Sequence, residues 1–288
     1  MAPAAPNGEG PLAILCGGGG IPRAVADAVA QSGRRVVLFP VRGWAEPKTV
    51  ESYPHHWVSL GQYGRFCRLL RAEGCRDFVA IGTLVRPSIW QVRLDWGTLR
   101  VFPRIWRAFH GGDNHMLSSL GRIMEDDGFR LLAAHEVAPA ILVPEGRLGR
   151  RAPGAGDQAD IALALALLRA TGPFDIGQAA VVADGRVLAL EAAEGTDQML
   201  ARVAEMRRQG RIRGRTGAGV LVKAPKPGQD HRFDLPSIGP QTVDGVTKAG
   251  LAGLAVVAGA TIMAEPQRIA QRAGETGVFV LGVPREDG

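Results

Sequence analysis

A loop between residues 223 and 242 carries the side chains best suited to phosphate chemistry. It follows the apolar run 219–222 and has the sequence KAPKPGQDHRFDLPSIGPQT. Its charged candidates are Lys223, Lys226, Asp230, Arg232 and Asp234. Lysine and arginine bind phosphate oxygens, and aspartate binds a hard cation or a water. The alternative is a solvated surface loop. However, the loop begins where a predicted buried strand ends, which is a usual place for sites in α/β folds.

A glycine turn at residues 17–20 is the second candidate. It separates a short apolar strand from a predicted helix that begins Ile21-Pro22. No Lys follows as in a P-loop, and Pro22 replaces the third glycine of a dinucleotide fingerprint. Phe39-Pro40 also stands where that fingerprint needs an acid, so NAD binding is disfavoured. Two interpretations stay open. Gly17, Gly18, Gly19 and Gly20 bind phosphate at a helix N-terminus, or they are needed sterically in a tight turn.

Acidic and polar residues at predicted strand ends give weaker signals. Glu191, Glu194 and Asp197 lie at a strand-to-helix junction, where they bind a cation or sugar hydroxyls, or only favour the helix dipole. Thr196 beside them is a substrate-binding candidate or a simple N-cap. The other substrate-binding candidates are Ile21, Pro22, Thr83, Arg86, Asp113, Gln229, Arg232 and Thr242. Arg86 equally suits a surface ion pair, and Asp113 equally suits an N-cap.

Composition favours a globular protein with anionic partners. The 288 residues are 46% hydrophobic, with a net charge of +6 and a pI of 9.8. The basic run 207–215 contains no aromatic residue, so nucleic acid is not an expected partner. Three cysteines and six histidines show no zinc spacing, and sparse cysteine fits a reducing cytoplasm. No apolar run reaches the roughly 20 residues of a spanning helix.

The elements that must position these residues form two α/β halves. Strands are predicted near 11–15, 36–39, 57–60 and 78–81, with helices at 21–31 and 65–73, and the chain opens as a βαβ unit. The segment 148–157 is predicted to be an exposed turn between domains. In the second half, Asp184-Gly185 predicts a hairpin with a type I′ turn.

Five motifs carry a resemblance to a known family: Ile14–Pro22, Gly82–Pro87, Gly112–Asn114, Glu191–Asp197 and Gly219–Pro240. In these motifs the chain resembles the LpxI family, the UDP-2,3-diacylglucosamine pyrophosphatases of lipid A biosynthesis. The resemblance covers the chain from about Leu12 to its C-terminus, and the loop after strand 219–222 is its most specific part. One departure is Gly112-Asp-Asn114, where the family commonly has a second Asp.

The resemblance implies a fold and an activity. It implies an N-terminal Rossmann-like βαβ domain, residues 11–147, which binds the nucleotide-lipid. It also implies a C-terminal catalytic α/β domain of hydrolase type, residues 148–288, that is specific to the family. The implied reaction is Mg²⁺-dependent hydrolysis to UMP and 2,3-diacylglucosamine 1-phosphate (lipid X), with water directed at the β-phosphorus. Asp230 is the implied catalytic carboxylate, and a homodimer is the implied assembly.

The residues themselves agree with pyrophosphate chemistry. Such hydrolysis needs charge neutralisation and an aligned water rather than a covalent nucleophile. Lys223 and Lys226 are the catalytic candidates for this neutralisation, with Arg232 beside them. Asp230 ligates the metal, with Asp234, or orients the water, and the sequence does not separate these roles. We expect a cytoplasmic enzyme peripheral to the inner membrane. The alternatives are a non-catalytic UDP-lipid binding protein of the regulatory class and a nucleotide-sugar transferase.

Overall fold

The protein is an α/β protein with two compact units. The computed structural model describes residues 10–83, 94–108, 121–174, 176–212, 217–226 and 235–285. The chain divides between Ile141 and Leu142. The predicted boundary after Arg147 lies later in the chain. Residues 142–147 fall in the second unit because strand Gly146–Arg147 pairs with its sheet. The narrower domain labels, Rossmann-like and hydrolase-type, stay predictions.

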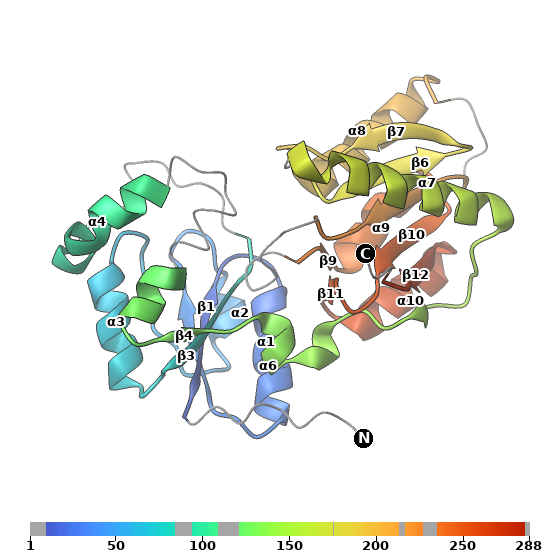
Figure 1. Ribbon diagram of the computed structural model, residues 1–288. Coiled ribbons are helices and arrows are strands. Elements are labelled where there is room, and N and C mark those ends of the chain that lie inside the picture. Colours follow the sequence, from blue (N-terminus) through green and yellow to red (C-terminus); the bar gives the residue numbers. More distant parts are fainter. Residues whose placement is uncertain are drawn as a thin grey trace. The chain divides into compact units, whose positions relative to one another are not determined.

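The N-terminal unit is built on a parallel sheet of four strands in the order β2-β1-β3-β4 (Figure 1). Alternate residues of a strand point to opposite faces. Ala13 therefore joins the core formed with Phe39, Phe66 and Phe78 on the α3 side, while α1 covers the other face. The elements are β1 (Leu12–Cys16), α1 (Ile21–Gln31), β2 (Val36–Pro40), α2 (Pro47–Val50), α3 (Tyr63–Ala72), β3 (Asp77–Ile81), α4 (Trp96–Ala108), β4 (Arg130–Leu131), α6 (Ala134–Val137) and the 3-10 turn η2 (Pro139–Ile141).

In the order of the strands, β1 is the point from which the chain extends to opposite sides of the sheet. From β1 the chain first moves to β2 on one side and later returns to β3 on the other side. In doubly wound sheets, the connections after such a pair of strands diverge and leave room for a ligand beyond the carboxyl ends. The segments after β1 and β3 are the glycine turn and Gly82-Thr83. They are therefore the N-terminal positions best placed to meet a ligand.

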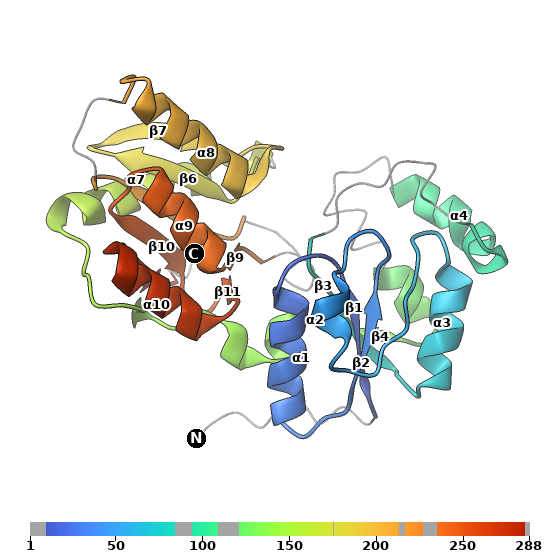
Figure 2. The ribbon, with the colours of Figure 1, turned by 180° about the vertical axis from the view of Figure 1, so that it is seen from behind.

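The C-terminal unit is built on a mixed sheet of six strands in the order β5-β12-β10-β8-β6-β7 (Figure 2). Strands β8, β10 and β12 are parallel, and β6 runs antiparallel to both β8 and β7. A small parallel pair, β9 with β11, lies outside this sheet. The elements are β5 (Gly146–Arg147), α7 (Ala155–Thr171), η3 (Gly172–Phe174), β6 (Ala179–Ala183), β7 (Arg186–Leu190), α8 (Gly195–Arg208), β8 (Val220–Lys223), β9 (Ser237–Ile238), α9 (Pro240–Lys248), β10 (Gly253–Val257), β11 (Ile262–Met263), α10 (Pro266–Thr276) and β12 (Phe279–Val283).

Helices cover both faces of the C-terminal sheet. Val181 and Leu221 pack with Met199 of α8 and with residues of α9 and α10 on one face. Val182 and Val222, one residue further along each strand, pack with Ala164 of α7 on the opposite face. Burial on both faces explains why these strands are continuous apolar runs rather than alternating ones.

Several expectations from the sequence are tested by this fold. The hairpin at Asp184-Gly185 is confirmed, since both residues have positive φ, 50° and 71°. The segment 57–60 is not a strand. It lies beside β2 through isolated bridges such as Val41 with Val58, because Pro40 has no N–H to continue a ladder. The segment 148–157 lies in the C-terminal unit, where Leu148 N–H donates to Val280. Among the described residues, no helix is both long and apolar enough to cross a bilayer.

Candidate active site

One edge of the C-terminal sheet collects buried polar groups. Strands β7, β8, β10 and β12 all end there, and β6 begins there, because Ala179 is opposite Lys223. We call this the C-terminal carboxyl edge and define it by Gln178, Glu191, Thr196, Lys223 and Ser237. Helices α8 and α9 follow this edge directly, so their N-terminal N–H groups favour negative charge there.

Lys223 is the buried cation of this edge. It is the last residue of β8 and is only 7% exposed. Its Nζ donates to the Ser237 carbonyl oxygen at 2.8 Å, which ties the end of β8 to β9. A buried ammonium is costly unless it is hydrogen-bonded or faces negative charge. Its position at the root of the 223–242 loop therefore suits a phosphate oxygen. Lys226, three residues further along, is half-buried.

Glu191 is a buried carboxylate whose two oxygens accept hydrogen bonds from other groups of this edge. Its Oε1 accepts from Thr196 Oγ1 at 2.7 Å, and its Oε2 accepts from the Gln178 N–H at 2.7 Å. A Cβ at Gly177 would lie 2.5 Å from Glu191 Cγ, so only glycine fits there. Glu191 thus fixes the start of α8 and orients the hydroxyl of Thr196. The sequence shows Glu191 only as one acid of a cluster and does not reveal this structural role.

The other acids of this junction point elsewhere. Glu194 pairs with Arg202 at 2.7 Å. A hydrogen bond from the backbone N–H of Glu194 is the main cause that lowers the pKa of its carboxyl group, and the hydrogen bond from Arg202 lowers it further. Asp197 is exposed in the first turn of α8. Within the described ranges, no three His, Cys, Asp or Glu residues come close enough to hold a metal ion.

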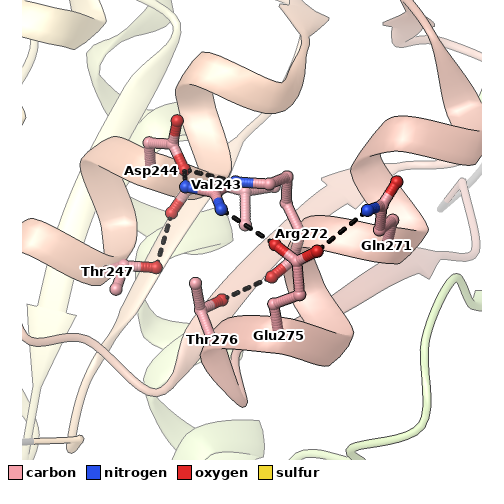
Figure 3. A network of polar contacts seen from close by, with 7 residues as sticks. All are labelled: Val243, Asp244, Thr247, Gln271, Arg272, Glu275 and Thr276. Carbon is pink, nitrogen blue, oxygen red and sulfur yellow. Dashed lines mark hydrogen bonds and ion pairs between the residues drawn. The ribbon is translucent and has the colours of Figure 1, made fainter.

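Two sets of hydrogen bonds fix helix α9, one in its first turn and one in its second turn. The Gly239 N–H donates to Thr242 Oγ1 at 3.2 Å, so the buried Thr242 caps its own helix. On α10, Arg272 donates to Asp244 Oδ1 from Nε at 3.0 Å and from Nη2 at 2.6 Å (Figure 3). Arg272 also binds Glu275 at 2.8 Å and, with Gln271, lowers the pKa of Glu275. These contacts hold the α9 N-terminus in place.

The glycine turn of the N-terminal unit is shaped by close backbone contacts. The Gly17 N–H donates to Ile81 O and the Gly18 N–H donates to Thr83 O, both at 2.9 Å. A Cβ at Gly17 would lie 2.6 Å from Thr83 O, and Gly19 has φ of +88°. Steric need therefore accounts for both Gly17 and Gly19, while two N–H groups of the turn are already bound within the protein.

The remaining residues of the turn begin a helix. Gly20 is the N-cap of α1, and Ile21 and Pro22 are its first residues. Thr83 is exposed beside the turn. Burial raises the pKa of Cys16 just before it to about 12, which disfavours the reactive thiolate form of this side chain.

Six predicted site residues lie outside the described residues. They are Arg86, Asp113, Gln229, Asp230, Arg232 and Asp234. The structure brings Lys223, Thr196, Thr242 and the buried Glu191 to one unit, whereas Gly17 to Pro22 and Thr83 belong to the other. The C-terminal carboxyl edge combines a buried cation with two helix N-termini, which is a setting for phosphate groups.

The chain matches known proteins over nearly its whole length. The family model of the LpxI N-terminal domain matches residues 11–141, and that of the LpxI C-terminal domain matches residues 144–281. UDP-2,3-diacylglucosamine pyrophosphatase LpxI of Caulobacter vibrioides (strain ATCC 19089 / CIP 103742 / CB 15) is 39% identical over 276 residues. The match covers 96% of this chain and 98% of that protein.

Proposed function

The chain belongs to the LpxI family, and on this premise we propose that it hydrolyses the pyrophosphate bond of UDP-2,3-diacylglucosamine. The products are UMP and 2,3-diacylglucosamine 1-phosphate, an intermediate of lipid A biosynthesis. The observation that carries the proposal is the full-length match to a relative of that name, with both domain models in the same order. A structural observation also supports the proposal, namely the buried cation Lys223 at the start of the candidate loop.

The proposed chemistry is stabilisation of phosphate charge with alignment of a water. Lys223 and the α8 and α9 N-termini supply positive potential where the pyrophosphate develops charge. Lys226 and Arg232 add charge from the same loop, and Gln229 orients a phosphate oxygen or the water. Glu191 holds Thr196 toward this edge, so the hydroxyl is positioned before substrate arrives. We propose that the water attacks the β-phosphorus.

A divalent cation fits the donors that the loop offers. Glu191 and Glu194 are already bound to Thr196 and Arg202, so the described edge supplies no spare pair of carboxylates. Asp230 and Asp234 would hold Mg²⁺, which prefers one or two carboxylates together with phosphate oxygens. The ion would neutralise phosphate charge. Asp230 itself binds the ion or orients the water. A homodimer is part of the same proposal.

The test is hydrolysis of the named substrate. Purified protein is incubated with UDP-2,3-diacylglucosamine and Mg²⁺, with and without chelator, and UMP is measured. The proposal predicts chelator-sensitive release of UMP. Tight binding without UMP would instead identify a UDP-lipid binding protein or a transferase that lacks its acceptor. In ¹⁸O-labelled water, label in the sugar phosphate supports attack at the β-phosphorus, and label in UMP means attack at the α-phosphorus.

A further inference from the structure

Helix α4 presents an apolar face to the solvent. Trp96 is 87% exposed, and Leu94 and Leu99 are about half exposed. Trp96, Leu99 and Arg100 are spaced three and four residues apart, so they lie on one face of the helix. Phe102 extends the exposed apolar surface. Single exposed apolar residues are ordinary, but three on one helix, with Leu94 just before it, form a candidate interaction surface. We call Leu94, Trp96, Leu99 and Phe102 the α4 apolar face.

The opposite side of α4 is firmly attached to the N-terminal unit. The Thr98 N–H donates to Asp95 Oδ1 and the Arg65 N–H to Asp95 Oδ2, both at 2.8 Å. A Cβ at Gly97 would lie 2.3 Å from Gly64 Cα, so α3 and α4 approach as closely as two backbones can. The α4 apolar face is therefore held outward by packing on its reverse side and is presented as a rigid surface.

Charge next to the α4 apolar face selects the kind of partner. Arg100 is exposed and has no ion-pair partner in the described part of the chain. Arg104 is exposed and pairs with Asp126 at 3.1 Å. The sequence of α4 contains arginines and no acidic residue. A short helix with Trp, Leu and Phe on one side and arginine beside them has the composition of a helix that lies in a bilayer interface. Arginine also draws such a helix to anionic headgroups.

We propose that the α4 apolar face docks on the surface of an anionic lipid bilayer. Trp96 and Leu99 enter the boundary between headgroups and acyl chains, and Arg100 meets the lipid phosphates. The choice of a bilayer as partner rests on the proposed function, because a diacylated substrate resides in a membrane. Helix α4 lies on the bilayer rather than across it, since none of the described helices meets the length and hydropathy of a span.

Vesicle flotation with the full chain tests this directly. Vesicles of phosphatidylcholine alone are compared with vesicles that also contain phosphatidylglycerol. The double variant Trp96→Ser/Leu99→Ser should lose binding to anionic vesicles by about tenfold or more. Arg100→Gln should weaken it by about fivefold, and only on anionic vesicles. The matched control is Phe174→Ser/Val187→Ser, which removes exposed apolar residues of the C-terminal unit and should bind like wild type.

Other outcomes would overturn the proposal. Normal flotation of Trp96→Ser/Leu99→Ser, or equal losses in the matched control, would mean that α4 does not dock. If the wild type does not float and the double variant changes only the sedimentation mass, the face is a contact between copies. UMP release from detergent-dispersed substrate separates the two proposals. The double variant should keep that activity, and a wild type that floats without any hydrolysis would contradict only the proposed function.

Discussion

In the glycine turn, backbone N–H groups are bound to neighbouring carbonyls, whereas at the C-terminal carboxyl edge the buried polar groups are side chains. Gly17 donates to Ile81 at the end of β3 and Gly18 donates to Thr83 just after it, and a Cβ at Gly17 would lie 2.6 Å from the Thr83 backbone oxygen. Close backbone packing therefore accounts for Gly17 and Gly18. At the carboxyl edge, Lys223 and Glu191 are buried although burial of charge is costly. Glu191 is satisfied by Thr196 and Gln178, and we propose that the positive charge of Lys223 serves the chemistry at this edge.

Replacement of Lys223 by Met should give the largest effect. It removes a buried cation that the account uses to stabilise phosphate charge, so turnover should fall by at least about 100-fold. UMP release measures the effect, and thermal unfolding monitors the fold. Lys248→Met, at the end of α9, is the control and should keep normal turnover. Wild-type turnover in Lys223→Met would contradict the proposal that the C-terminal carboxyl edge, rather than the glycine turn, carries the chemistry.

Substitution of Gly17 by Ala tests the steric account of the glycine turn. Its Cβ would lie 2.6 Å from a backbone oxygen, so the free energy of unfolding should fall by about 1–3 kcal/mol. Urea unfolding measures it. The same change at Gly156 in α7 has open space and should not destabilise the protein. If Gly17→Ala kept full stability but lost affinity for substrate, the turn would be a ligand site after all.

Loss of the Glu191 carboxylate should have a smaller effect on stability. Glu191→Ala leaves the Gln178 N–H and the Thr196 hydroxyl without their acceptor, so we expect a loss of about 1–2 kcal/mol. Glu205→Ala on the exposed side of α8 is the control and should unfold like wild type. A larger fall in turnover than in stability would sharpen the comparison, because it would show that Glu191 positions Thr196 for the reaction.

Asp77 should give the smallest effect, and one that depends on pH. Burial raises the pKa of Asp77, but hydrogen bonds from Arg130 and Arg34 outweigh it and the net pKa lies below 3.8. The ionised carboxylate therefore stabilises the folded N-terminal unit above pH 3.8, and this contribution is lost as the pH falls below that value. Asp77→Asn should cost about 1 kcal/mol at neutral pH, because the amide keeps the shape and one acceptor oxygen and the exposed Arg130 can return to solvent.

Urea unfolding of wild type and Asp77→Asn across pH 2–7 checks that expectation. The difference between the two proteins should shrink toward the acid end. Asp126→Asn, which removes an exposed aspartate, is the control and should follow wild type throughout. A constant difference would mean that Asp77 acts by packing rather than by its charge.

Much of the fold could be predicted because local patterns decide it. The βαβ opening and the Asp184-Gly185 hairpin depend on apolar periodicity and turn chemistry, which are local. The apolar residues of segment 57–60 predict a strand, although it forms only isolated bridges. Whether such a run joins a ladder depends on its neighbour, here β2 ending at Pro40.

The candidate site could be predicted only in outline. Lys223 stands out in the sequence as the residue after an apolar strand, and it is buried at the end of β8. The inward direction of Glu191 depends on Gly177, fourteen residues earlier, which comes close only through the β6–β7 pairing. The exposure of the α4 apolar face likewise depends on how α3 packs behind it, which no short stretch of sequence encodes.

The most direct test of the central claim is UMP release by Asp230→Asn beside the wild type, with Asp126→Asn as a matched control. All three are assayed with UDP-2,3-diacylglucosamine and Mg²⁺, and substrate binding is measured separately. The account predicts that Asp230→Asn binds substrate but loses nearly all turnover, while Asp126→Asn turns over normally. Near-normal UMP release by Asp230→Asn would contradict the placement of the chemistry in the loop that follows Lys223.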